Sequence, residues 1–238
     1  MATILKKKNR LKRHRLIHYF NILFNIIFIY LFLYLGTNIH FLLYLLIFPS
    51  TFFIYILNKK IKKLNSGIKG EDTTLQVLKK LKNSYTVLSD LKIKSDHNSA
   101  QIDTIVIGKN GVFIIETKNI FGFICGNGND KTISISNKYY SNGKTNFKMY
   151  NPCRQVKTHI KKINKILKNL NVDCNVDGII YFTNPNANVI FKSTPLKIFL
   201  HKTSGGYDML NYISNSNKGK NLTKKEQSLV INVLKKYL

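Results

Sequence analysis

The chain has 238 residues, and its 38 Lys and Arg side chains outnumber its 11 Asp and Glu side chains, which gives a formal net charge of +27 at pH 7. A field of that sign attracts phosphates, either of nucleic acid or of anionic lipid headgroups. Biased base composition of the gene would raise the lysine content, but it does not explain why carboxylates are so few. The three cysteines, Cys125, Cys153 and Cys174, show neither a CxxC pair nor Cys/His ligand spacing, which argues against a disulfide framework or a zinc site.

Residues 1–15 form a basic arm with seven Lys or Arg side chains and no acid. Residues 16–58, which follow, contain no Asp, Glu, Lys or Arg. Within them, two apolar stretches of 19 residues, 17–35 and 39–57, lie on either side of a polar break at 36–38. Each stretch is close to the roughly 20 residues with which a helix crosses a hydrocarbon layer of about 30 Å. Because backbone groups in lipid must be satisfied internally, we expect a transmembrane helical hairpin over residues 16–58.

The charges that flank this hairpin predict its orientation. Lys59, Lys60, Lys62 and Lys63 follow the second stretch directly, and the polar break carries no charged residue. By the positive-inside rule, we expect a multi-pass protein of the cell membrane with both termini and the soluble domain in the cytoplasm. A cleavable signal peptide is the alternative, but the apolar run is too long for one and a second span follows it. Pro49 could also make the second span kinked or re-entrant.

Residues 64–238 have the mixed pattern of a soluble domain, with 27 basic and 11 acidic side chains and a net charge of +16 (27 − 11). Apolar residues at helical spacing predict helices over 74–81, 152–170 and 225–238. Apolar runs and alternating patterns predict strands over 85–93, 100–107, 111–117, 121–125, 132–136, 176–182, 188–191 and 196–200. Since the first strands are joined by turns too short for crossovers, the predicted class is α/β, with a mixed central sheet flanked by helices.

Two neighbouring strands carry the residues with the clearest chemistry. Asp103 lies in a strand that a turn at Asn110-Gly111 joins to the next, and Glu116 and Lys118 lie at the end of that next strand. Residues on either side of a tight hairpin face each other, and residues two apart on a strand share a face. Two buried carboxylates are costly unless a cation lies between them, and Mg²⁺ or Mn²⁺ suits oxygen ligands of this kind. Taken alone, a Glu-x-Lys sequence is more often a solvated surface pair.

The order of motifs around this pair resembles the NERD (nuclease-related) domain, which is similar to the PD-(D/E)xK superfamily of restriction-type nucleases. The matching motifs are Gly70-Glu71, residues 87–91, 101–103 and 111–118, Gly122, and Asn151-Pro152-x-x-Gln155. The resemblance implies a restriction-endonuclease-like fold. It also implies roles for five residues: Glu71, Asp103 and Glu116 would ligate the metal, Lys118 would assist the attacking water, and Gln155 would position water or phosphate.

These features predict a membrane-anchored, metal-dependent endo- or exonuclease that hydrolyses phosphodiester bonds in DNA rather than RNA, with the basic domain attracting phosphates. Tyr139, Tyr140, Phe147 and Tyr150 are candidates for contacting the strand, unless their segment is a plain surface hairpin. The alternative function is a non-catalytic nucleic-acid-binding or scaffolding membrane protein on a nuclease fold. A third interpretation, a structural membrane protein whose basic faces bind anionic lipid, leaves the acidic residues unexplained.

Overall fold

The computed structural model describes residues 1–6, 10–95, 98–136 and 147–238. The chain divides into two compact units. Met1–Lys8 together with Gly70–Leu238 form what we call the α/β unit, and Asn9–Lys69 form the hairpin unit. The nucleic-acid contacts predicted at Tyr139 and Tyr140 lie outside the described residues. The predicted α/β class is confirmed.

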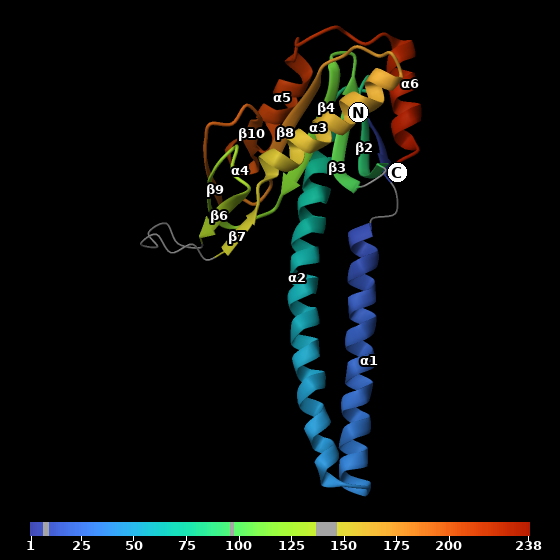
Figure 1. Cartoon of the computed structure of the whole chain (residues 1–238), viewed down its shortest axis with the longest axis vertical. Coiled ribbons are helices and arrows are strands. Elements are labelled where there is room, and N and C mark those ends of the chain that lie inside the picture. The colour runs from blue at the N-terminus through green and yellow to red at the C-terminus, as the bar shows by residue number, and fades with distance from the viewer. Residues whose placement is uncertain (7–9, 96–97, 137–146) are drawn as a thin grey trace. The chain divides into compact units, whose positions relative to one another are not determined.

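A six-stranded mixed sheet forms the middle of the α/β unit (Figure 1). Its strands in chain order are β1 (Thr3–Lys6), β2 (Thr86–Ser95), β3 (Asn98–Gly108), β4 (Gly111–Lys118), β8 (Val176–Phe182) and β10 (Lys197–Leu200). Their order in the sheet is β1-β2-β3-β4-β8-β10. Strands β2, β3 and β4 are antiparallel neighbours, whereas β1 is parallel to β2 and β8 is parallel to both β4 and β10. The short turns between the first strands thus produce the antiparallel part, as predicted.

A second sheet has four strands in the order β7-β6-β5-β9. They are β5 (Gly122–Asn127), β6 (Thr132–Ser136), β7 (Phe147–Tyr150) and β9 (Ala187–Lys192). Ile124 and Ile133 of this sheet lie in one buried cluster with Phe182 of β8 and with Val156, which belongs to the helix that follows β7. The small sheet therefore packs against the large sheet at the C-terminal ends of β4 and β8.

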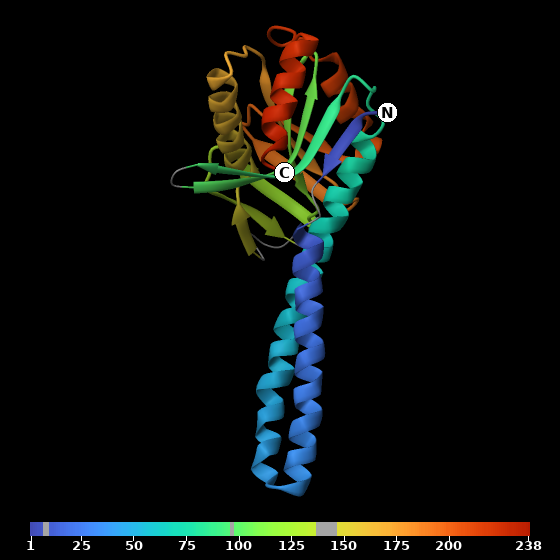
Figure 2. The ribbon, with the colours of Figure 1, turned by 90° about the vertical axis from the view of Figure 1, so that its right-hand side faces the viewer.

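Helices cover both faces of the main sheet (Figure 2). They are the end of α2 (Ile47–Leu78), α3 (Pro152–Asn169), α4 (His201–Ser204), α5 (Tyr207–Asn215) and α6 (Lys224–Lys235). Because successive strand residues point to opposite faces, Phe113 packs in a cluster with Leu78 of α2, whereas Ile114 packs with Ile163 of α3 and Val230 of α6. The adjacent residues of β4 thus belong to two different cores, and both cores fix the position of that strand.

In the hairpin unit, α1 (Arg10–Asn38) and the first part of α2 run side by side, joined by the 3₁₀ helix η1 (Phe41–Leu46) (Figures 1 and 2). Arg10–Asn38 and Phe41–Leu78 are both long and apolar enough to cross a membrane. In the most apolar 18 residues of each, 0% and 6% of the residues are buried, so most apolar side chains face outward. The core helix of a soluble protein has the opposite distribution.

Four details differ from the sequence prediction. Helix α1 continues through the expected break, because Thr37 and Asn38 bond back to carbonyls of the preceding turn, and the chain reverses at η1 instead. Pro49 does not interrupt α2, since it lies in the first turn, where its missing N–H is not needed. The helix predicted at 74–81 is the end of the long α2. Residues 3–6 of the expected basic arm form β1, through a long-range pairing with β2 that local sequence does not reveal.

Candidate active site

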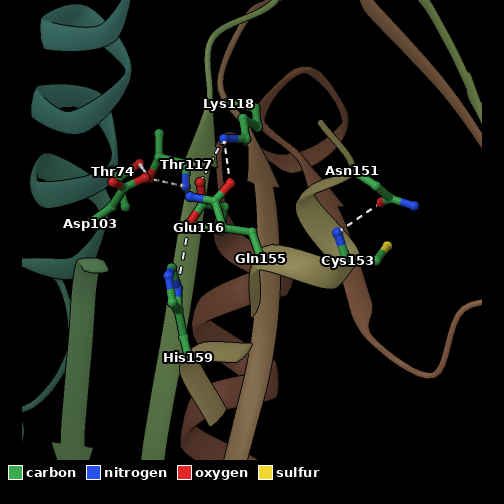
Figure 3. Close-up of polar contacts among 9 residues, drawn as sticks. All are labelled: Thr74, Asp103, Glu116, Thr117, Lys118, Asn151, Cys153, Gln155 and His159. Atoms are coloured by element: carbon green, nitrogen blue, oxygen red, sulfur yellow. Dashed lines mark hydrogen bonds and ion pairs between the residues drawn. The ribbon is translucent and has the colours of Figure 1, made fainter. Parts of the chain in front are cut away.

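Strand β4 ends in Glu116 and Lys118, whose side chains lie on one face, as the two-residue period of a strand predicts (Figure 3). Glu116 is buried, with 1% of its surface exposed, and Lys118 Nζ donates to its Oε1 at 2.6 Å. The Lys118 side chain is itself only 17% exposed. This contact is a charge-assisted hydrogen bond in a largely dry setting. It is not the solvated surface pair that a Glu-x-Lys sequence alone suggests.

Helix α3 begins beside the site, and local bonds fix its start. The Asn151 side chain accepts from Cys153 N at 2.9 Å, and Pro152 occupies the first turn. The Asn151 amide also donates to the carbonyls of Asn127 and Asp130, both at 2.8 Å. The first turn of α3 is therefore anchored to the β5–β6 turn, which determines where the later residues of the helix lie.

Gln155 and His159 lie four residues apart on α3 and both face the β4 pair (Figure 3). Lys118 Nζ donates to Gln155 Oε1 at 3.3 Å. His159 is 4% exposed, and its Nδ1 lies 3.8 Å from Oε2 of Glu116. Sequence reasoning identified Gln155 but missed His159. The four-residue spacing, which places two side chains on one helix face, is the signal that could have found it.

Asp103 lies where the ladder between β3 and β4 ends. The last ladder pair is Thr104 with Ile115, so Asp103 and Glu116 are the next two residues in register. In place of a ladder bond, Thr117 N donates to Asp103 Oδ2 at 3.1 Å. The hairpin thus brings the two predicted carboxylates onto adjacent strands, and the main chain of β4 holds the aspartate.

Glu71 comes from α2 and is 7% exposed. Gly70 lets the helix approach the end of β4, because a Cβ at this position would lie 3.0 Å from Cβ of Asn119 and 3.2 Å from Cγ2 of Thr117. One turn further on, Oγ1 of Thr74 lies 2.9 Å from Oγ1 of Thr117. Thr74 and Thr117, neither of them identified from the sequence, therefore connect the helix that carries Glu71 to the strand that carries Glu116.

Burial and mutual repulsion raise the pKa of the acidic groups. Burial, followed by the charge of Asp103, raises the pKa of Glu71 to about 7. The same two causes raise the pKa of Glu116, although Lys118 opposes them. Burial alone would lower the pKa of the Lys118 ammonium, but the carboxylates of Glu116 and Asp103 outweigh it and raise that pKa above its ordinary value. Because Asp103 repels both glutamates, the three carboxylates share one electrostatic environment.

A fourth carboxylate, Asp90, lies on the β2 side of Asp103, where the β2–β3 ladder is interrupted. Its φ of 65° is in the left-handed region, which Asp adopts more readily than most residues. Asp90 is 8% exposed, and its Oδ1 accepts from Gln101 Nε2 at 3.2 Å. Its charge is a further cause of the raised pKa of Glu71. Asp90 falls within a motif of the family resemblance, but sequence reasoning gave it no role.

Three buried atoms at this site have no hydrogen-bond partner among the described residues: Oε2 of Glu71, Oε2 of Glu116 and Nδ1 of His159. A buried carboxylate oxygen without a donor is costly, and a divalent cation such as Mg²⁺ or Mn²⁺ takes oxygen ligands of this type. Across the described ranges, however, no three His, Cys, Asp or Glu side chains are grouped so that they could hold one ion. The carboxylate oxygens are chemically suitable ligands for such an ion. That Glu71, Asp103 and Glu116 together bind one stays a prediction.

Comparison with known proteins supports the motif order. Residues 66–183 match the model of the family described as nuclease-related domain (NERD), and all five predicted site residues lie in this range. The chain is 35% identical over 104 residues to an uncharacterized protein of Bacillus anthracis, an alignment that covers 43% of this chain and 47% of that protein. The chain thus spans about half the length of this relative. No solved structure matches the chain.

Proposed function

Since residues 66–183 form a nuclease-related (NERD) domain, we propose that the chain is a membrane-anchored, divalent-metal-dependent nuclease that hydrolyses phosphodiester bonds in DNA. The observation that carries the proposal is the buried Glu116 carboxyl. One of its oxygens accepts from Lys118 Nζ at 2.6 Å, and the other has no hydrogen-bond partner among the described residues. Apolar residues in place of a buried ion pair often leave a protein at least as stable, so stability alone does not explain why Glu116 and Lys118 are buried here. A buried carboxylate with a strongly raised pKa is typical of a functional site.

Glu71, Asp103 and Glu116 would hold the metal ion. When bound, such an ion supplies a Lewis acid that stabilises the charge developing on the phosphate and lowers the pKa of a bound water. The raised pKa values of Glu71 and Glu116 reflect burial and the repulsion from Asp103, and a bound cation would offset both.

The other side chains act on the reacting groups or position those that do. With its raised pKa, the Lys118 ammonium is charged near neutral pH and can donate to the attacking water or to a phosphate oxygen. Gln155 orients this ammonium through its Oε1. His159 is a positioning residue: burial, followed by the charges of Lys118 and Lys162, lowers its pKa to about 4, so a neutral ring lies beside Oε2 of Glu116.

Charge and hydropathy support the substrate and the anchoring. The net charge of +16 on residues 64–238 attracts the phosphates of a nucleic acid irrespective of sequence. The two long apolar helices support insertion into the membrane, and the basic residues on both flanks favour a cytoplasmic location for both termini. A reporter enzyme fused after Leu238 tests this topology: we expect activity only in the cytoplasm, and external activity would contradict it.

The cleavage proposal is tested with the full chain in detergent. It would be incubated with plasmid and with linear DNA in Mg²⁺, Mn²⁺ or EDTA, beside Glu116→Gln and Lys118→Met. Glu226→Gln and Lys235→Met, both in α6, are matched controls. We expect metal-dependent cleavage by the wild type and the controls, and a loss on the order of 10²-fold or more in each site variant.

Two results would overturn the proposal. If the wild type retards DNA in a gel but leaves it intact with every metal, the chain is a non-catalytic nucleic-acid-binding protein. If cleavage survives in both Glu116→Gln and Lys118→Met, the activity does not arise at this site.

A further inference from the structure

Where the apolar stretches of the hairpin unit end, α1 and α2 leave a pocket of about 380 Å³ between them. Leu11, His14 and His18 line it from α1, at a spacing of three and four residues that places them on one helix face. At one end of the pocket the helices approach closely, because a Cβ on Gly67 would lie 3.2 Å from Cδ1 of Leu11. The pocket therefore lies between α1 and α2, next to the point at which Gly67 and Leu11 bring the two helices together.

The wall from α2 is both apolar and basic. Lys60, Lys63 and Leu64 line it at helical spacing, and the aliphatic stems of the lysines can cover apolar surface while their ammonium groups face water. No Asp or Glu occurs from residue 9 to residue 69, so the hairpin unit contains no carboxylate that could neutralise them. The accessible surface inside the pocket is almost entirely apolar, whereas Lys60 and Lys63 are exposed. The ligand that suits this arrangement therefore has an apolar part next to an anion.

The position along the hairpin indicates which anion. The run without charged residues covers residues 16–58, so His18 lies two residues inside one end of it and Lys60 two residues outside the other. At about 1.5 Å per residue, both lie within roughly 3 Å of the level at which the expected hydrocarbon layer ends. The headgroup layer, roughly 5–8 Å thick on each side of a bilayer, lies directly beyond that level.

We propose that this pocket binds an anionic phospholipid from the cytoplasmic leaflet, with the apolar part of the lipid inside the pocket and its phosphate on the exposed ammonium groups of Lys60 and Lys63. The leucines of the lining suit the apolar part of the lipid next to its phosphate. A free phosphate ion would leave these leucines without a partner, so a lipid fits the pocket better. The proposal rests on the membrane insertion of the hairpin and not on nuclease activity.

Selective lipid retention tests the proposal in the full chain. The chain would be loaded with equal amounts of phosphatidylglycerol and phosphatidylcholine, exchanged into detergent, and its bound lipid counted by native mass spectrometry. Lys60→Gln with Lys63→Gln removes two charges from the pocket, whereas Lys59→Gln with Lys62→Gln removes the same charge from residues that do not line it. Detergent removes the bilayer surface and its diffuse attraction, so only lipid held at a site is retained.

We expect the pocket pair to lower phosphatidylglycerol retention about tenfold and the control pair to change it less than about twofold. Lys60→Arg with Lys63→Arg should restore retention, because arginine keeps the positive charge. Alkaline extraction of membranes checks that every variant still inserts.

Three outcomes would overturn the proposal. Equal losses in the two lysine pairs would mean diffuse attraction rather than a site. Equal retention of the two lipids by the wild type would mean an apolar groove without preference for an anion. Displacement of the lipid by inorganic phosphate alone would mean a site for a free ion.

Discussion

The hairpin unit and the α/β unit each place a different kind of group in an unfavourable setting. The hairpin unit exposes apolar side chains, of which Phe20, Tyr30 and Phe48 are 70%, 68% and 72% exposed. The α/β unit instead buries Glu71 and Glu116, which are 7% and 1% exposed. Neither arrangement is favourable in water alone. In the proposed function, hydrocarbon would cover the apolar side chains of the hairpin unit and a cation would lie at the carboxylates of the α/β unit.

The largest expected effect compares the same side chain in the two units. Phe113 of β4 is fully buried, whereas Phe20 of α1 is 70% exposed. Phe113→Ala should lower the free energy of unfolding by about 3–5 kcal/mol, because a cavity remains in the core. Phe20→Ala should change it by less than about 0.5 kcal/mol. Urea unfolding of the full chain in detergent measures both, and a similar loss in the two variants would show that α1 lies in a protein core.

A charge in the middle of α1 tests the hydrocarbon partner. Ile27 of α1 and Ile190 of β9 are 59% and 57% exposed, so an arginine fits sterically at either position. Ile27→Arg should disfavour membrane insertion by about 2.5–3.5 kcal/mol, whereas Ile190→Arg should leave insertion unchanged. The measurement is the fraction of the chain that resists alkaline extraction. If both variants resist extraction as the wild type does, α1 does not cross the hydrocarbon layer.

Strands of both sheets and part of the site were predictable because they depend on local pattern. The strands predicted at 132–136 and 176–182 match β6 and β8 residue for residue. The sequence alternates in β6 and is largely apolar in β8. The strand period placed Glu116 and Lys118 on one face in the same way. Other features depend on long-range packing. His159 reaches Glu116 only because α3 packs on β4, and β1 forms only because β2 pairs with it.

The helices α4 and α5 were not predicted for a related reason. Both begin without a side-chain cap, after Leu200 and Gly206 respectively, so the usual polar start signal is missing from the sequence. Gly205 and Gly206 take left-handed conformations between them. The burial of Met209 and Ile213 against the main sheet stabilises α5 instead, and this contact cannot be derived from the segment alone.

The pH dependence of stability without metal should be a somewhat smaller effect than that of Ile27→Arg on membrane insertion. In the folded chain the pKa of Glu71 is raised from 4.5 to about 7, so between these values the native state holds a proton that the unfolded state releases. Stability therefore falls as the pH rises through this window, by about 2–3 kcal/mol from Glu71. His159 acts in the opposite direction, since its pKa is lowered from 6.5 to about 4 and its contribution to stability rises with pH between these values.

Glu71→Gln isolates the first contribution, because His159 is common to both proteins. In EDTA, the variant and the wild type should be about equally stable at low pH, and the variant should be the more stable above pH 7. Mg²⁺ should reverse that order, since it stabilises the protein that binds it. Unfolding curves across the pH range measure this difference. If the free energies of unfolding of the two proteins change with pH in parallel, the pKa of Glu71 is not raised.

The most direct test of the central claim, that the buried carboxylates hold a divalent cation, is calorimetric titration of the full chain with Mn²⁺ near pH 7. We predict saturable binding with proton release to the buffer, because the raised pKa values of Glu71 and Glu116 mean that bound protons must leave when the ion enters. Glu116→Gln should abolish this binding, and Glu226→Gln should retain it. Absence of saturable binding in the wild type, or the same binding in Glu116→Gln, would contradict the claim.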